Sequence, residues 1–269
     1  MADEKTEDKK KNPIVEFLEL IVTVGVIVFV VKSLVMEPFR IPSQSMDPTL
    51  TVGDYIITTK FSYGYGRNTF MFDLPLIQDR MLWNEPKRGD VAVFAHPQEG
   101  YRIIKRVVGV PGDVIELRNS ELYINGQQAR RSDQEPAQSD ADNEWRGSFF
   151  EETFVRQDGS THQHRIWDKY NYVDPDFCAA NASVCLLRTG TDDFGPFEVP
   201  EDHVFFLGDN RDSSGDSRFR LGAVHRRHLI GKAQFVLFSF RIQMPQNSNS
   251  LRMNWVNPFR WDRFFKGVR

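Results

Sequence analysis

The feature that most constrains this chain is a long apolar stretch near its N-terminus, residues 14–35. Its middle, residues 20–31, carries no charged side chain. Glu16 and Glu19 lie near its start and Lys32 lies near its end, where charged side chains can reach lipid headgroups. A helix needs roughly 20 residues to cross a bilayer, so the stretch is long enough to span one. The sequence therefore predicts a transmembrane helix here.

Two other interpretations of this stretch compete with a membrane anchor. One is a buried helix of a soluble protein. The other is a cleaved secretory signal, because the uncharged middle is short. A cleaved signal ends in a small-x-small site, whereas residues 32–38 read Lys-Ser-Leu-Val-Met-Glu-Pro and contain no such site. We therefore expect an uncleaved anchor.

The charges on either side of the stretch predict its orientation. Residues 1–13 are polar and charged, as is typical of a disordered tail, and they contain four lysines. Only Lys32 and Arg40 follow the stretch closely. Because positive charge favours the cytoplasmic side, we expect a cytoplasmic N-terminus and a main body outside the cytoplasm.

Beyond the anchor, short apolar runs between turn residues predict a mainly β protein. These runs cover residues 55–57, 90–94, 114–117, 121–124 and 233–240. Asn125-Gly126 predicts a tight hairpin turn. Long amphipathic helical patterns are absent from the sequence outside the anchor.

Residues 127–200 differ in character from the rest, being rich in Asp, Gln, Ser, Asn and Arg. We expect an inserted polar subdomain on the β core. Both cysteines, Cys178 and Cys185, fall in it. They are either two separate buried thiols or a disulfide that closes a short loop, and an exported domain favours the disulfide. Two cysteines without nearby partner ligands do not predict a zinc site.

These patterns divide the chain into successive segments. They are a cytoplasmic tail (1–13), a transmembrane anchor (14–36), a first part of the β core (37–126), the inserted subdomain (127–200), a second part of the core (201–243) and a C-terminal tail (244–269). The tail ends in mixed aromatic and basic residues, so it either packs on the core or touches the membrane.

A first candidate site lies directly after the anchor, in residues 38–50. Two prolines, Pro42 and Pro48, flank Ser43 and Ser45 and stiffen the backbone there. A rigid mount suits a nucleophile that must be held in one position. Taken alone, the segment is also compatible with a polar turn.

A second candidate is Lys105, which lies within an apolar β run between Ile104 and Val107. Such a lysine is either exposed or desolvated. Desolvation lowers the pKa of an amine, and a neutral lysine can take a proton from a serine hydroxyl. The run alone does not decide between the two.

A third candidate is the polar segment 208–218, which contains Asp209, Asp212 and Asp216. A calcium loop needs oxygen ligands at alternate positions, and Arg211 occupies one of these. A turn held by Asp–Arg pairs explains the segment better than a metal site.

Together, the three segments resemble sequence boxes of the bacterial type I signal peptidases. They match Ser-x-Ser-Met-x-Pro-Thr-Leu from Ser43, Lys-Arg-x-x-Gly-x-Pro-Gly-Asp from Lys105, and Gly-Asp-Asn-Arg-Asp-x-Ser-x-Asp-Ser-Arg from Gly208. Their order and the preceding anchor also match, which makes the resemblance specific. It covers roughly residues 30–125 and 203–240.

The resemblance implies a Ser/Lys-dyad serine endopeptidase on a mostly antiparallel β core, without metal or cofactor. Ser45 is the expected nucleophile and Lys105 the expected general base. Ser43, with the backbone amide of Ser45, is expected to form the oxyanion hole. Ser214 is expected to orient Lys105. Acyl transfer needs a nucleophile, a base and an oxyanion hole, and the boxes supply all three.

The resemblance also assigns supporting residues. Ion pairs expected to brace the site involve Arg106, Asp209, Asp216 and Arg218. Apolar pockets that select small residues before the cut are expected from Ile41, Pro42, Met46, Leu50, Ile56, Val93, Ile103 and Ile104. Arg102 departs from the family at one pocket edge, where an acidic residue can occur, and this affects only fine specificity.

The expected partners are preproteins that carry signal peptides, cut after an Ala-x-Ala-like motif, and the lipid bilayer. The expected location is the bacterial inner membrane, with a single span and the catalytic domain on the outer, periplasmic side. The formal net charge of −3 gives no indication of nucleic-acid binding.

Three other functional classes compete with this interpretation. A Ser-His-Asp protease needs a histidine, but none of the six lies in the boxes: His96, His162, His164, His203, His225 and His228. A membrane-tethered binding protein would tolerate loss of Ser45. A soluble self-cleaving Ser-Lys regulator is disfavoured by the anchor.

Overall fold

The computed structural model describes most of the chain outside its N-terminal tail. It covers residues 12–70, 80–132, 135–136, 148–168, 192–243, 252–253 and 257–269. The two cysteines, Cys178 and Cys185, lie outside the described residues.

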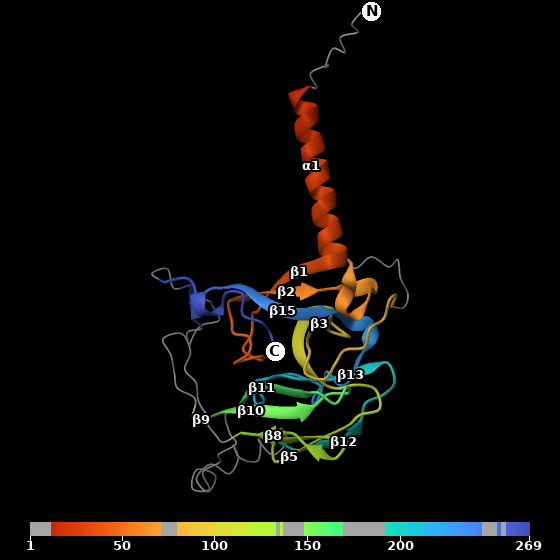
Figure 1. The fold of residues 1–269 in the computed structure, drawn as a ribbon, viewed down its shortest axis with the longest axis vertical. Helices are drawn as coiled ribbons and strands as arrows, with labels where there is room; N and C mark the ends of the chain where they lie inside the picture. Colours follow the sequence, from red (N-terminus) through yellow and green to blue (C-terminus); the bar gives the residue numbers. More distant parts are fainter. Residues whose placement is uncertain are drawn as a thin grey trace, which may run out of the picture.

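The N-terminal apolar stretch forms one helix, α1 (Pro13–Val30), which continues into a π-helical turn, η1 (Val31–Val35). Asn12 caps its start by accepting a hydrogen bond from the Ile14 amide at 3.0 Å. No residue of α1 is buried, and the helix projects away from the body of the molecule (Figure 1). By length and composition, residues 13–35 can cross a membrane.

The base of this helix is tied to the body. The chain passes directly from η1 into strand β1 (Met36–Arg40). The Lys60 amide donates to the Val35 carbonyl at 3.0 Å, and the Tyr65 hydroxyl donates to the Leu34 carbonyl at 2.8 Å. These bonds fix how the body sits against the end of the helix.

The largest sheet is antiparallel and has seven strands. In spatial order these are β1, β2 (Asp54–Thr59), β15 (Leu229–Ser239), β3 (Val91–Ala95), β4 (Arg102–Gly109), β13 (His203–Leu207) and β14 (Val224–His225). Strand β15 lies between β2 and β3 although it comes far later in the chain. The sheet therefore combines early and late strands of the sequence in one core.

Smaller sheets complete the body. One contains β12 (Phe194–Glu198), β5 (Val114–Arg118), β6 (Glu121–Ile124) and β7 (Gln127–Gln128). Another contains β11 (Thr161–Asp168), β10 (Ser148–Val155) and β8 (Arg130–Arg131), with β9 (Glu135–Pro136) also on β10, and β16 (Ile242–Gln243) pairs with β17 (Arg252–Met253). Short 3₁₀ turns are η2 (Phe61–Tyr63), η3 (Arg67–Thr69), η5 (Arg226–His228) and η6 (Trp261–Arg263). In Figure 1, β5, β8 and β12 lie at the end of the body away from α1.

The predicted fold class is confirmed: a mainly antiparallel β protein with one apolar N-terminal helix. All five predicted runs form strands, and the predicted Asn125-Gly126 turn joins β6 to β7. Both turn residues have positive φ, 54° and 76°, as such a tight turn requires. The long hairpin of β10 and β11 was not predicted.

The C-terminal segment 257–269 packs on the core. The Val236 amide donates to the Lys266 carbonyl at 2.8 Å, so the segment lies along strand β15. Arg263 forms a buried ion pair with Asp54 at the start of β2 (2.5 Å). Of the two expectations for the tail, packing on the core is what these residues show.

Candidate active site

Ser45 lies in the turn between β1 and β2. The Leu50 amide donates to the Met46 carbonyl at 2.9 Å, and the Asp47 amide donates to the Gln44 carbonyl at 3.0 Å. Met46 and Leu50 are fully buried in the core, so this short turn is anchored by its own apolar side chains. Ser45 itself is 8% exposed.

Lys105 reaches this turn from strand β4. Its Nζ lies 2.5 Å from Ser45 Oγ, within hydrogen-bonding distance. The side chain is buried, and burial lowers the pKa of Lys105 from 10.5 to about 8, although the carboxylates of Asp216 and Asp209 act in the opposite direction. This lowered pKa makes the neutral amine, which could accept the Ser45 proton, much more populated near neutral pH than in a free lysine.

Ser43 lies beside the nucleophile. It is exposed, and its Oγ is 3.4 Å from Ser45 Oγ. Both side chains therefore point to the same region, although residues 43–45 form a bend and turn rather than the extended segment that the sequence suggested.

Ser214 lies behind the nucleophile turn without the predicted hydrogen bond to Lys105. Its hydroxyl is buried and has no hydrogen-bond partner among the described residues. A Cβ on Gly208 would come within 2.2 Å of Ser214 Oγ and 2.5 Å of the Ser45 carbonyl oxygen, so only glycine fits there. Lys105 is instead directed at Ser45.

Two buried ion pairs flank the dyad. Arg106 donates two hydrogen bonds to the Asp209 carboxylate, of 2.7 and 2.6 Å. Arg218 holds Asp216 at 2.9 Å, and Asp216 also accepts the Gly208 amide at 3.0 Å. The four residues predicted to brace the site are therefore paired as two Arg–Asp couples.

The predicted pocket residues separate into groups. Five of them are buried in one hydrophobic cluster, with Ile104 packed against it: Ile41, Met46, Leu50, Ile56 and Val93. Ile103 packs against a second cluster, which contains Phe94 and Phe206. Pro42 is exposed. The first cluster lies under the Ser45 turn and extends across β2 and β3.

No histidine takes part in this constellation. His162 and His164 are buried near Arg106, and burial followed by the nearby arginine charges lowers the pKa of both, that of His162 to about 3. In the described part of the chain, which includes all six histidines, none donates to or accepts from Ser45. The geometry disfavours a Ser-His-Asp mechanism.

Asn210 is a residue of this site to which the sequence gave no role. Its backbone amide donates to the Ser45 carbonyl at 3.2 Å, and its side-chain Nδ2 donates to the Gln44 carbonyl at 3.0 Å. It is fully buried. Its position in the third box could have indicated a role in the site, but its contacts with Gln44 and Ser45 are visible only in the structure.

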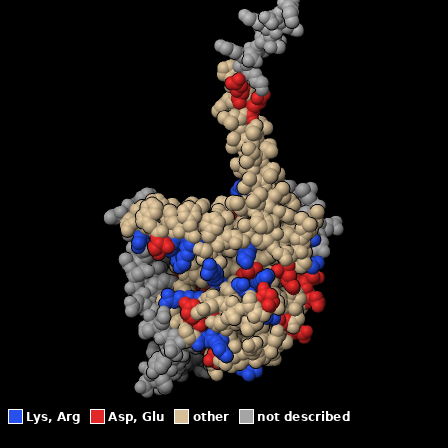
Figure 2. Space-filling model, viewed as in Figure 1, with Lys and Arg blue, Asp and Glu red and all other residues tan. Residues whose placement is uncertain are grey.

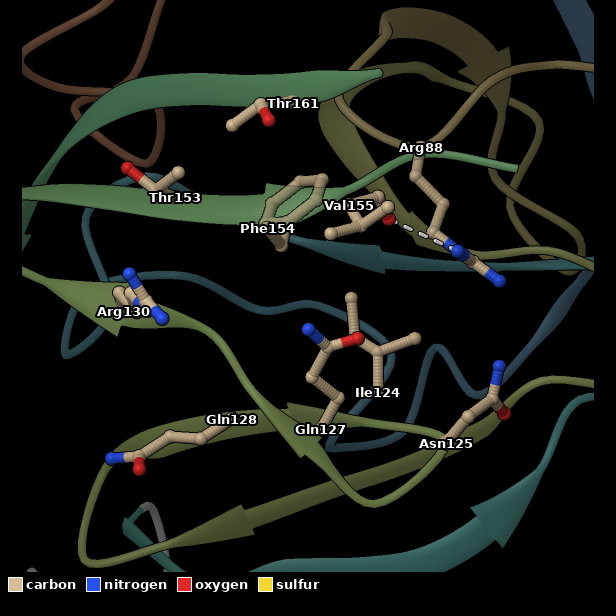
Figure 3. Close-up of a pocket in the computed structure, with 10 residues that line it drawn as sticks. All are labelled: Arg88, Ile124, Asn125, Gln127, Gln128, Arg130, Thr153, Phe154, Val155 and Thr161. Atoms are coloured by element: carbon tan, nitrogen blue, oxygen red, sulfur yellow. Dashed lines mark hydrogen bonds between the residues drawn. The ribbon is translucent and has the colours of Figure 1, made fainter. Parts of the chain in front are cut away.

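A cavity of about 310 Å³ lies elsewhere, between β6–β7 and β10 (Figure 3). It is lined by Ile124, Gln128, Arg130 and Phe154 among others, and by none of the predicted site residues. Within the described ranges, no group of three or more His, Cys, Asp or Glu side chains is arranged to hold a metal ion.

Comparison with known proteins agrees with the geometry. Residues 14–238 match the family model for signal peptidase, peptidase S26. The signal peptidase I of Rickettsia typhi is 34% identical over 90% of this chain and 89% of its own, and that of Rickettsia rickettsii is 36% identical over 90% and 88%. A solved signal peptidase I from Enterococcus faecalis is 25% identical, covers 55% of this chain and 97% of its own, and has a TM-score of 0.31. The sequence relatives carry the assignment.

The family model and the sequence relatives define a serine peptidase, and its N-terminal apolar helix is compatible with a membrane anchor. The chain belongs to the signal peptidase family, peptidase S26. The family that the three sequence boxes predicted is therefore confirmed.

Proposed function

We propose that this chain removes N-terminal signal peptides from exported preproteins, with Ser45 as nucleophile and Lys105 as its general base. The observation that carries the proposal is the contact of 2.5 Å between Lys105 Nζ and Ser45 Oγ. Both side chains are buried, and burial lowers the pKa of Lys105 to about 8, so the neutral amine is far more accessible near physiological pH than in a free lysine and has a hydroxyl as its partner.

The proposed reaction follows from these positions. Neutral Lys105 takes the Ser45 proton as Oγ attacks the scissile carbonyl, and the ammonium then gives the proton to the leaving amine. The Ser45 backbone amide and the Ser43 hydroxyl donate to the oxyanion. A water molecule, activated by the same lysine, then hydrolyses the acyl-enzyme. No metal or cofactor takes part in this mechanism.

Substrate selection is proposed to come from the apolar cluster beneath the nucleophile turn. Ile41, Ile56 and Val93 are 2% exposed or less and form part of the apolar core beneath the turn. The resemblance to the type I signal peptidases supports cleavage after a small-x-small motif such as Ala-x-Ala, with these apolar side chains facing the small residues.

The proposed location is the bacterial inner membrane, with the N-terminus in the cytoplasm and the catalytic body on the outer, periplasmic side. The part of the body that adjoins α1 shows almost no charged side chains, whereas charges crowd the part further from the helix (Figure 2). Phe61, Trp261 and Phe265 are more than half exposed. Exposed aromatic side chains favour contact with a membrane surface, so we propose the lipid bilayer as a partner.

Cleavage of a purified precursor in detergent tests the proposed function. The wild type is expected to release the mature protein, with its new N-terminus directly after the small-x-small motif, and Ser45→Ala is expected to leave the precursor intact. Cleavage by Ser45→Ala at the wild-type rate would exclude the assignment of the nucleophile.

A further inference from the structure

The β10–β11 hairpin, Ser148–Asp168, contacts the segment that holds the nucleophile turn. The Trp167 amide donates to the Asp209 carbonyl at 2.8 Å, and the Arg211 amide donates to the Trp167 carbonyl at 2.9 Å. Trp167 thus pairs with Asn210 as in a short parallel ladder. The end of β11 is therefore hydrogen-bonded to the backbone on both sides of Asn210.

Asn210 connects the end of β11 to the turn that contains Ser45. It is fully buried, and it binds two successive carbonyls of the turn, those of Gln44 and Ser45. We call these two hydrogen bonds the Asn210 clamp. A residue that fixes the clamp also fixes the backbone position of Ser45 relative to Lys105.

Glu152 of strand β10 is a buried charged residue that pairs with Arg211 next to the Asn210 clamp. It is completely buried and forms a two-pronged ion pair with Arg211, next to the clamp. Arg131 Nε and His164 Nε2 lie 3.6 and 3.7 Å from its carboxylate oxygens. Burial acts to raise the pKa of Glu152, but the arginine charges outweigh it and the pKa is lowered, so the carboxylate is ionised.

We propose that Glu152 is a positioning residue for the nucleophile: its ion pair with Arg211 holds the Asn210 clamp on the carbonyls of Gln44 and Ser45. This inference rests on the proposed function, because it takes Ser45 as the nucleophile. It gives the polar hairpin a task in the reaction although no side chain of the hairpin contacts the dyad.

Loss of the ion pair should affect turnover more than substrate binding. A shift of about 1 Å in a reacting group can cost about 100-fold in rate. The proposed pocket residues Ile56 and Val93 lie on β2 and β3, which are held by the hydrogen bonds of their own sheet rather than by the clamp, so the substrate should bind almost as before.

The chain offers a matched control at the other end of the same hairpin. Arg88 forms a two-pronged ion pair with Asp113 (2.8 and 2.5 Å) and donates to the Val155 carbonyl at 3.0 Å (Figure 3). The side chains of this pair are 12% and 6% exposed, so it resembles the Glu152–Arg211 pair in burial and geometry. It makes no contact with the nucleophile turn.

The test compares steady-state cleavage of a signal-peptide precursor by full-length Glu152→Gln, Arg211→Lys and Arg88→Lys, assayed well below their melting temperatures. We expect kcat to fall by about 10- to 100-fold in the first two, with KM within about twofold, and to stay near wild type in Arg88→Lys. Equal losses in Arg211→Lys and Arg88→Lys, or an unchanged kcat in both, would overturn the proposal. If Glu152→Gln does not fold, Arg211→Lys decides the outcome.

Amide hydrogen exchange at Asn210 gives a readout that is independent of activity. The exchange should accelerate in Glu152→Gln or Arg211→Lys and remain slow in Arg88→Lys. Unchanged exchange in the first two would refute the clamp. If Ser45→Ala proved fully active, the proposed function would fail, but this exchange measurement would still test whether Glu152 holds the clamp.

Discussion

In the proposed mechanism, burial suits Lys105 to act as a base because its partner is a hydroxyl. Lys60 is also buried, and burial lowers its pKa as well, but its Nζ lies 2.9 Å from a carboxylate oxygen of Glu37 and bonds to the Thr69 carbonyl. Those partners favour the ammonium. Lys105 has Ser45 Oγ in the corresponding place, so loss of its proton leaves an acceptor beside a nucleophile.

The pH dependence of the rate follows from this burial. With a pKa of about 8, Lys105 is mainly protonated below pH 8. Its neutral fraction falls about tenfold for each unit by which the pH drops further. We expect kcat/KM for a peptide substrate to rise with pH and to level off above about pH 8. A profile that rises until about 10.4, the pKa of a free lysine, would show that the base is solvated.

Ser43 should contribute to the transition state rather than to stability. Because its Oγ lies beside Ser45 Oγ and is exposed, Ser43→Ala removes a donor to the oxyanion without opening a cavity in the core. We expect kcat to fall by about 10²–10³-fold with little change in melting temperature. Ser62→Ala, on a turn away from the dyad, is the control. An unchanged kcat would remove Ser43 from the site.

At the scale of single residues, the sequence predicts which residues form the candidate site better than it predicts how they contact one another. The resemblance to the signal peptidase boxes selected Ser45 and Lys105, and the structure brings them together. The predicted hydrogen bond of Ser214 to Lys105 is absent, and the lysine instead bonds to Ser45. The Asn210 clamp depends on two segments 165 residues apart meeting in space, which no local pattern reveals.

At the scale of elements, the strands that sequence predicts are those with apolar interior faces. The β10–β11 hairpin escaped prediction because several of its buried positions are polar: Glu152, His162, His164 and Asp168. A strand that buries charge shows no apolar alternation, so its pattern resembles that of a polar loop. Such burial is tolerated here because arginines from other elements pair with the carboxylates.

The C-terminal segment should stabilise the nucleophile turn. Arg263 pairs with Asp54, which is fully buried, and also donates to the Thr49 carbonyl at 2.9 Å. We expect Arg263→Gln to lower the free energy of unfolding by about 3–5 kcal/mol, because it leaves the Asp54 charge buried and unpaired. Chemical denaturation measures this. Arg118→Gln, which breaks an exposed pair with Glu116, should change stability little, and equal effects would contradict the account.

At the scale of the whole molecule, the anchor and the uncharged band of the body lie together (Figure 2). Trp261 is 66% exposed and packs with tilted ring planes against Phe259 and Phe264 in an aromatic cluster beside β15. This arrangement predicts that the cluster contacts the surface of the bilayer that α1 is proposed to cross.

Fluorescence quenching by brominated lipid tests this orientation. In full-length protein reconstituted into brominated phosphatidylcholine vesicles, Trp261 should be quenched relative to matched unbrominated vesicles, because amphipathic aromatic rings sit at headgroup level. Trp261→Ala should therefore remove part of the quenching. Quenching that is identical in wild type and variant would place the cluster away from the lipid.

The most direct test of the central claim is a double-mutant comparison of the dyad. We measure single-turnover precursor cleavage by Ser45→Ala, Lys105→Ala and the double variant, with Lys60→Met as the control for loss of a buried lysine. If the two residues act as one unit, each single variant should lose about 10⁶-fold in rate and the double variant should lose no more, while folded Lys60→Met should cleave normally. Near-normal cleavage by Lys105→Ala, or losses that add in the double variant, would contradict the account.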